Sequence, residues 1–159
     1  MRRKISLMVA TCFTTMFLFG CGNDVQTKWI GQVAIKKVSN DRVAVLINPC
    51  DAPLMDVRFT ATSPSQRFAK LIPLDSPHAS PFEMSYSIDP NATDSLPIFT
   101  QNIGEFHIYA VAPSADTRTR SVHATREELL ALKDGELITG DHQVSNIDKF
   151  AHCQTRFNS

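Results

Sequence analysis

Short segments in which apolar and polar residues alternate constrain the fold of this chain more than any other feature. Segments 55–61, 82–88 and 104–112 show this alternation most regularly. Because successive side chains of a strand point to opposite faces, each segment predicts a strand with one face on a core and the other in water. The chain is therefore expected to be mainly β.

Further segments extend this pattern. Segments 32–38 and 42–47 flank a turn-forming Ser-Asn-Asp sequence, which predicts a hairpin, and the second segment is apolar enough to be a central buried strand. Segments 68–74 and 117–123 are weaker candidates, the first because it contains Pro73, which disfavours the interior of a sheet. Roughly six or seven short strands at this spacing predict an antiparallel β-sandwich of immunoglobulin-like or transthyretin-like topology.

Helical patterns are confined to the C-terminal third. Thr125 and Glu128 form the pattern of a capping box ahead of a leucine-rich run, and Gly135 is a suitable stop. A second short helix is expected to begin near Ser145 and to direct Cys153 toward the core. The prediction is thus a β-sandwich with one or two short C-terminal helices.

The first twenty residues have the composition of an export signal. Arg2, Arg3 and Lys4 form a basic start, and an uncharged apolar stretch follows from 5 to 19. The stretch is shorter than the roughly 20 apolar residues that a membrane-spanning helix needs. A secretory signal peptide is therefore favoured over a permanent transmembrane helix.

The sequence Leu18-Phe19-Gly20-Cys21 at the end of this stretch resembles the lipobox of bacterial lipoproteins. The resemblance implies diacylglycerol on the Cys21 sulfur and cleavage just before this cysteine. It covers the targeting segment alone. An ordinary secretory signal beside a cysteine and an uncleaved apolar N-terminus are the alternatives.

The predicted organisation is a signal peptide (1–20), a lipidated tether (21–27) and a single domain (28–159). The length of the last segment suits one domain with its own core.

The location expected from the lipobox is the cell envelope. Because Gly22 rather than Asp follows the lipidated cysteine, lipoprotein sorting implies the periplasmic side of the outer membrane in a cell with two membranes, or the outer face of the plasma membrane in a cell with one.

The cysteines fit the same compartment. Of the four in the chain, Cys12 leaves with the signal and Cys21 takes the lipid, so Cys50 and Cys153 remain. In an oxidising envelope this pair predicts a disulfide that closes a loop of about 100 residues. Two buried free thiols are the alternative.

Charge makes nucleic acid an unsuitable partner. Removal of the signal takes three basic residues and no acid, so the 16 basic residues fall to 13 against 16 acidic ones, a net charge of −3. The remaining sequence has no basic stripe of the kind that phosphate backbones require.

No metal or cofactor is predicted. The histidines lie far apart in the sequence and lack the paired spacings of zinc motifs, although spacing leaves open a site assembled in space. The histidines are His78, His107, His123, His142 and His152.

Catalytic motifs are also missing from the sequence. It has no Gly-x-Ser-x-Gly elbow and no Ser-x-x-Lys. Segment 75–80 combines an acid, hydroxyls and His78, but residues adjacent in sequence rarely face one another as a catalytic triad does, so an inter-strand loop is favoured. We therefore do not expect an enzyme.

Four residues are candidates for contact with a partner: Trp29, His78, Arg118 and Arg120. Trp29 is either an exposed aromatic contact, for a partner or for the membrane interface, or a cap on one end of the core. Arg118 and Arg120 share one face of an expected edge strand, which they either protect from pairing or offer for recognition.

Two functions remain open at this level. The first is a membrane-anchored, non-catalytic module that binds another envelope protein as a subunit, adaptor, or inhibitor or immunity factor. The second is a small envelope enzyme or ligand carrier whose site is assembled from separate loops. The missing catalytic motifs favour the first.

Overall fold

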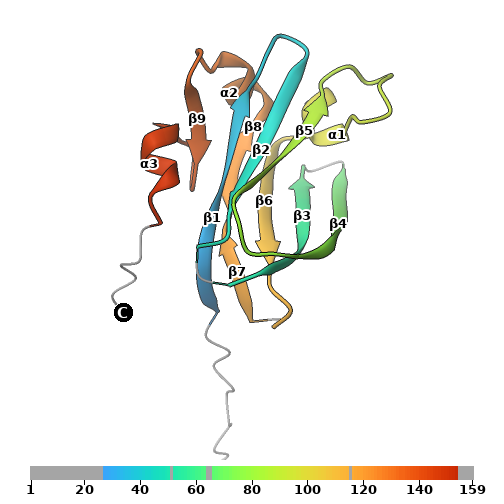
Figure 1. The fold of residues 1–159 in the computed structure, drawn as a ribbon. Coiled ribbons are helices and arrows are strands. Elements are labelled where there is room, and N and C mark those ends of the chain that lie inside the picture. Colours follow the sequence, from blue (N-terminus) through green and yellow to red (C-terminus); the bar gives the residue numbers. More distant parts are fainter. Residues whose placement is uncertain (1–26, 51, 64–65, 115, 154–159) are drawn as a thin grey trace, which may run out of the picture.

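The structure, a computed structural model, describes residues 27–50, 52–63, 66–114 and 116–153. Within these residues the protein is mainly β, as predicted, with ten strands in one mixed sheet that curls into a half-barrel (Figure 1). The strands are β1 (Lys28–Lys37), β2 (Arg42–Asn48), β3 (Leu54–Thr62), β4 (Arg67–His78), β5 (Phe82–Ser87), β6 (Glu105–Val111), β7 (Thr117–Arg120), β8 (Val122–Thr125), β9 (Glu136–Thr139) and β10 (Gln143–Asn146). The helices are α1 (Pro97–Thr100), α2 (Arg126–Ala131) and α3 (Ile147–Ala151).

Strand β1 is the centre of the sheet. One of its edges pairs antiparallel with β2, which continues to β5. Its other edge pairs first with β7, in parallel, and then with β9, antiparallel. From β7 the sheet continues through β6 and β3 to β4. The parallel pair of β1 and β7 makes the sheet mixed. The predicted antiparallel sandwich is not confirmed. Instead of two packed sheets, a single curled sheet brings the apolar faces of its own strands together.

Most of the predicted strands are present. The hairpin forms from β1 and β2, and β2 is a central, buried strand as its apolar sequence indicated. Strand β4 is longer than expected and includes Pro73. It lies at the end of the sheet, where the missing N–H of proline costs no hydrogen bond to a further strand. The segment 117–123 divides into β7 and the start of β8.

The alternation in β3 predicts two residues wrongly, Met55 and Asp56, and Asp56 is only 5% exposed although it was expected on the water-facing side. Met55 was expected on the core face, but it is 43% exposed, and Leu54 is fully buried instead. The pairing of β3 with β4 shifts register between Leu54 and Asp56. A bulge of this kind interrupts the alternation of side chains, so Met55 points to solvent.

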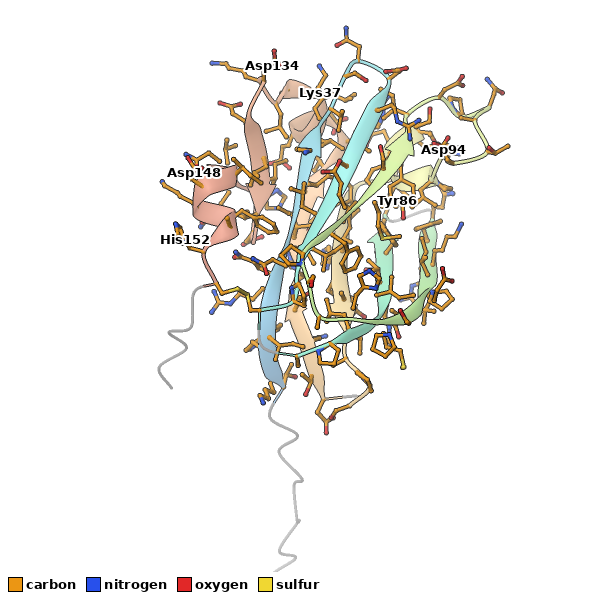
Figure 2. All side chains as sticks on the ribbon, in the orientation of Figure 1. Lys37, Tyr86, Asp94, Asp134, Asp148 and His152 are labelled. Atoms are coloured by element: carbon orange, nitrogen blue, oxygen red, sulfur yellow. A yellow bond between two sulfur atoms is a disulfide. The ribbon has the colours of Figure 1, made fainter. Side chains whose placement is uncertain are left out.

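An aromatic cluster fills the interior of the curl. Phe59 lies edge-on to Tyr86 and Phe99, with ring centroids 5.6 Å and 6.4 Å away, and Phe99 lies edge-on to Phe106 at 5.8 Å. Helix α1, which the sequence did not predict, delivers Phe99 to this cluster. Figure 2 shows Tyr86 among the side chains that fill the interior.

The two C-terminal helices form where the sequence predicted them. In α2, the Thr125 hydroxyl accepts a hydrogen bond from the Glu128 backbone, and the Glu128 carboxylate accepts one from the Thr125 backbone. Helix α3 is capped by Asn146, one residue after the predicted start, and it buries Phe150 against the outer side of the sheet.

The predicted disulfide between Cys50 and Cys153 is present, with 5.7 Å between the Cα atoms. It joins the segment after β2 to the segment after α3. Side-chain amides support the same contact: Gln32 donates a hydrogen bond to the carbonyl oxygen of Phe150, and Asn48 donates one to that of Ala151.

The predicted signal peptide, the predicted lipobox with Cys21 and most of the predicted tether lie outside the described residues. Among the residues that are described, no helix is both long and apolar enough to cross a membrane.

Candidate functional site

Trp29 and Arg118 form a stacked pair on the outer face of the sheet. They are register partners in the parallel pair of β1 and β7. The guanidinium carbon of Arg118 lies 5.0 Å from the centroid of the Trp29 ring and 5.4 Å from that of Tyr109. Trp29 remains 37% exposed. It is thus a surface side chain held by cation–π contacts rather than a cap on the core.

The backbone at Gly31 makes this pairing possible. The register of β1 against β7 shifts between Trp29 and Gln32, and Gly31 lies inside the shift with a φ of 75°. A Cβ atom at this position would lie 2.0 Å from the carbonyl oxygen of Asn48. Only glycine fits here, because it tolerates both the left-handed backbone and the close approach of β2.

Arg118 and Arg120 do not lie on an edge strand, so that part of the prediction is wrong. Strand β7 lies between β1 and β6 in the sheet. Thr117 and Thr119 face the interior, while the two arginines face outward. The Nε atom of Arg118 is buried, with no hydrogen-bond partner among the described residues. Protection of an edge therefore does not explain these arginines.

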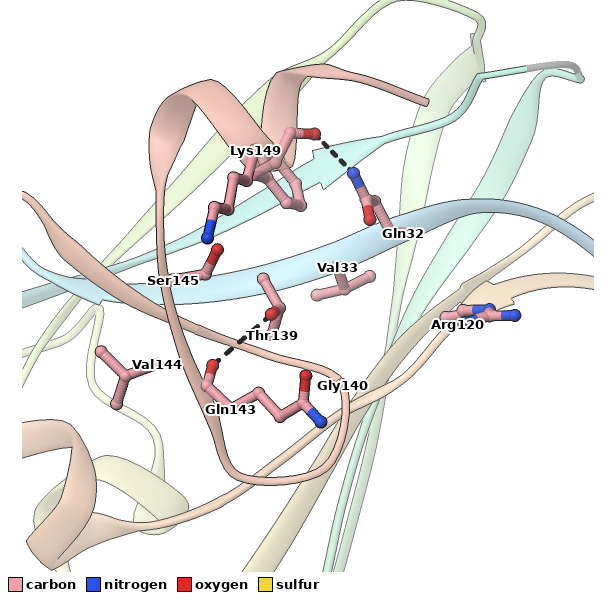
Figure 3. A pocket seen from close by; sticks show the side chains of 10 residues that line it. Gln32, Val33, Arg120, Thr139, Gly140, Gln143, Val144, Ser145 and Lys149 are labelled. Atoms are coloured by element: carbon pink, nitrogen blue, oxygen red, sulfur yellow. Dashed lines mark hydrogen bonds between the residues drawn. The ribbon is translucent and has the colours of Figure 1, made fainter. Parts of the chain in front are cut away.

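Two hollows flank Arg120. One, of about 260 Å³, lies between β1, β7, the β9–β10 hairpin and α3, and Gln32, Gln143 and Lys149 line it (Figure 3). The other, of about 320 Å³, is lined by Trp29, Arg120, His123 and the turn before β10. We refer to Trp29, Tyr109, Arg118 and Arg120 as the Trp–Arg face.

His78, the fourth candidate for partner contact, lies elsewhere. It ends β4, at the opposite end of the sheet path from β9 and β10. Its ring contacts that of Phe82 at 5.0 Å between centroids, and its Nδ1 lies 3.3 Å from the carbonyl oxygen of Ser76. The structure thus brings three of the four candidates together and leaves His78 apart.

Three of the histidines that lie far apart in the sequence come together in space, as the sequence left open. His107 on β6 and His123 on β8 are direct register partners, and their rings stack with 3.9 Å between centroids. Glu105 precedes His107 by two residues in the same strand, so both side chains share the outer face. His142 reaches the same place from the turn between β9 and β10. We refer to Glu105, His107, His123 and His142 as the histidine cluster.

The Glu105 carboxylate lies at the centre of the histidine cluster. Its Oε1 is 2.7 Å from Nε2 of His107 and 3.6 Å from Nδ1 of His123. Its Oε2 is 3.4 Å from Nε2 of His142. One carboxylate therefore faces three imidazoles.

Backbone hydrogen bonds fix the turn that carries His142. The His123 amide donates to the carbonyl oxygen of Gly140 at 2.7 Å, and the His142 amide donates to that of His123 at 3.1 Å. His142 adopts a φ of 53°, a left-handed conformation unfavourable for a residue with a side chain. Such a conformation persists only where the surroundings impose it.

Charges within the cluster act on one another. The hydrogen bond that the His142 ring donates to the Glu128 carboxylate raises the pKa of His142 above its ordinary value. Burial lowers the pKa of His123, and the charge of His107 lowers it further. The pKa of Glu105 is also lowered: burial alone would raise it, but the hydrogen bonds and charges of His107 and His142 outweigh burial. The site thus favours an ionised carboxylate and an uncharged His123 imidazole.

The alternation of segment 104–112 predicts Glu105 and His107 on the polar face of one strand, but it does not predict the histidine cluster. The pairing of β6 with β8 brings in His123, and the short strands β9 and β10 bring in His142. The signal available in the sequence was the Glu-x-His pattern in an alternating strand. The pairing register that completes the cluster could not be read from it.

We compared the chain with protein-family models, curated proteins and solved structures, and none of them matches.

Proposed function

We propose that this protein is a lipid-anchored module of the bacterial cell envelope, which binds another envelope protein through its Trp–Arg face and performs no catalysis itself. Residues 1–20 direct its export, and lipid on Cys21 holds it on a membrane. The membrane is the outer membrane, on its periplasmic side, or the plasma membrane, on its outer face.

The observation that carries this proposal is the exposed Trp29–Arg118 stack. Tryptophan, tyrosine and arginine dominate the energetic centres of protein interfaces. In this chain all three residue types gather on one outer face, and Arg118 lies between two aromatic rings. A face already ordered by such contacts loses little side-chain entropy when a partner binds.

The chemistry of the face indicates the kind of partner surface that it fits. Guanidinium groups form paired hydrogen bonds with carboxylates, so Arg118 and Arg120 suit an acidic partner segment. The hollows beside Arg120 offer room for side chains that flank such a segment.

The face also lies near the anchor. Trp29 is eight residues after Cys21 in the sequence, which spans at most about 29 Å even when fully extended. A partner that contacts Trp29 must therefore lie close to the membrane surface. This distance favours a membrane-associated protein over a freely diffusing one.

The anchor is tested by mass spectrometry of the mature N-terminus and by fractionation of a Cys21→Ala variant. The proposal predicts an acylated Cys21 as the first residue and release of the variant from the membrane fraction. An unmodified Cys21, or a variant that stays on the membrane unchanged, would contradict the anchor.

Binding is tested by chemical cross-linking in intact cells that express Trp29→Ala or Arg120→Glu. We expect one dominant protein adduct in the wild type and at least a tenfold loss of that adduct in both variants. Leu71→Ala is the matched control, because Leu71 is also an exposed apolar residue but lies on β4 at the far end of the sheet. Equal adduct yields from Trp29→Ala and Leu71→Ala would contradict the assignment of this face.

A further inference from the structure

We propose that the histidine cluster binds a divalent transition-metal ion, and that its donor atoms suit Zn²⁺ best. This inference is independent of the proposed partner binding. Either one can fail while the other holds.

The spacing of the donor atoms is close to that around a metal ion. One ligand atom each from Glu105, His107 and His123 lie within 4.8 Å of one another. Tetrahedral zinc with bonds of 2.0–2.2 Å holds its ligand atoms about 3.4 Å apart. The two distances from the Glu105 oxygen, 2.7 Å to His107 and 3.6 Å to His123, lie on either side of this value. The donor atoms of Glu105, His107 and His123 are therefore already gathered at separations near those around one zinc ion.

A fourth donor is adjacent. Nε2 of His142 faces the other oxygen of Glu105 at 3.4 Å. The carboxylate of Asp141 lies 3.6 Å from Nδ1 of His123 and 3.7 Å from Nε2 of His142. The turn that carries Asp141 and His142 is fixed to β8 by backbone hydrogen bonds, so its donors stay near the ion position.

In two histidines of the cluster, the ring nitrogen that does not face Glu105 lies within hydrogen-bond distance of another oxygen. Nε2 of His123 lies 2.8 Å from the Ser121 hydroxyl, which leaves its Nδ1 to face the Glu105 carboxylate. Nδ1 of His142 lies 2.8 Å from a Glu128 oxygen, which leaves its Nε2 to face the same carboxylate. Histidine ligands in metal sites characteristically donate the ring N–H that is not bound to the metal to an oxygen of this kind. His123 and His142 thus already have the outer hydrogen bonds that orient histidine ligands in metal sites.

The donor set selects among metals. Imidazole nitrogens suit Zn²⁺, Cu²⁺ and Ni²⁺, whereas Ca²⁺ and Mg²⁺ require oxygen ligands. With three imidazoles and one carboxylate, the cluster belongs to the first group. Zinc matches the mixed nitrogen and oxygen donors without demanding a planar arrangement.

The test is calorimetric titration of the full lipidated chain, in detergent, with Zn²⁺. We expect one zinc ion per chain, at least a tenfold weaker affinity in His107→Ala and His123→Ala, and no competition from Mg²⁺. His78→Ala is the matched control, because it removes a histidine on β4 outside the cluster and should leave the affinity unchanged.

Two further measurements keep the test decisive if a strand variant fails to fold. His142→Ala alters a turn rather than a strand, and it should also weaken zinc binding. In the wild-type protein, zinc should shift the imidazole NMR signals of His107, His123 and His142 and leave those of His78 and His152 in place. Absence of zinc binding at millimolar concentration, or binding that survives in His107→Ala and His123→Ala, would overturn the proposal. So would zinc-induced shifts confined to His78 and His152.

Discussion

Removal of the Cys50–Cys153 disulfide should lower the stability of the whole domain rather than release its C-terminus alone. The bond spans 103 residues, which include eight of the ten described strands, β3 to β10. Closing a loop of this length reduces the entropy of the unfolded chain by an amount equivalent to about 4.7 kcal/mol in the loop-closure model. Domains of this size are stable by about 5–15 kcal/mol in total, so the loss is a large fraction of the whole.

The native contacts near the bond explain why the folded form should persist without it. The hydrogen bonds from Gln32 and Asn48 to the backbone of α3, together with the burial of Phe150, do not require the sulfur atoms. The double variant Cys50→Ser/Cys153→Ser should therefore fold with an intact sheet. Loss of the disulfide should therefore lower the free energy of unfolding mainly because the unfolded chain gains entropy.

Urea unfolding followed by far-ultraviolet circular dichroism measures this cost. We expect a loss of about 3–5 kcal/mol in the double variant. Each single serine variant should lose a similar amount, because either one breaks the same bond. A loss below about 1 kcal/mol, with faster hydrogen exchange confined to α3, would refute the reasoning, because it would show that the bond holds only a locally fraying segment.

Four further predictions concern individual residues. Gly31→Ala should destabilise the domain by at least about 2 kcal/mol in urea unfolding, because the new Cβ meets the Asn48 carbonyl oxygen in a left-handed backbone; an unchanged midpoint would contradict this. Phe99→Ala should lower the free energy of unfolding by about 3–5 kcal/mol, since it leaves a cavity beside Phe59 and Phe106; a loss below about 1 kcal/mol would contradict the packing. Thr125→Ala should cost about 1 kcal/mol through loss of the α2 capping box, measured in the same assay. Burial raises the pKa of Tyr86 to about 12. Because an unfolded tyrosine ionises near pH 10, stability should be unaffected below about pH 10 and fall by up to about 3 kcal/mol between pH 10 and 12. Tyr86→Phe should abolish that part of the alkaline loss.

Local features of the fold could be predicted from the sequence because their causes are local. The first hairpin follows from apolar segments around a turn, and the α2 capping box follows from Thr125 and Glu128 three residues apart. The disulfide followed from counting cysteines rather than from geometry, and the structure confirms it.

Features that depend on pairing between distant segments could not be predicted. The parallel pair of β1 and β7 joins segments about 90 residues apart in the chain and turns the expected antiparallel arrangement into a mixed sheet. Strands β9 and β10, each only four residues long, are too short for the alternation of side chains to identify them. Bulges in β1 and β3 are likewise set by neighbouring strands.

The candidate sites divide in the same way. The sequence identified Trp29, Arg118 and Arg120 as residue types suited to contact, but their convergence depends on the β1–β7 register. The histidine cluster is the extreme case, because its members come from three segments that are separated in the sequence by other elements.

The claim that the Trp–Arg face binds an envelope protein is tested most directly by a photoreactive amino acid placed at position 120 in living cells. A probe at position 71, on β4, serves as the reference. The account predicts a discrete protein adduct from position 120, absent from position 71 and lost when Trp29→Ala is combined with the probe. Lipid adducts alone, or the same adducts from both positions, would contradict it.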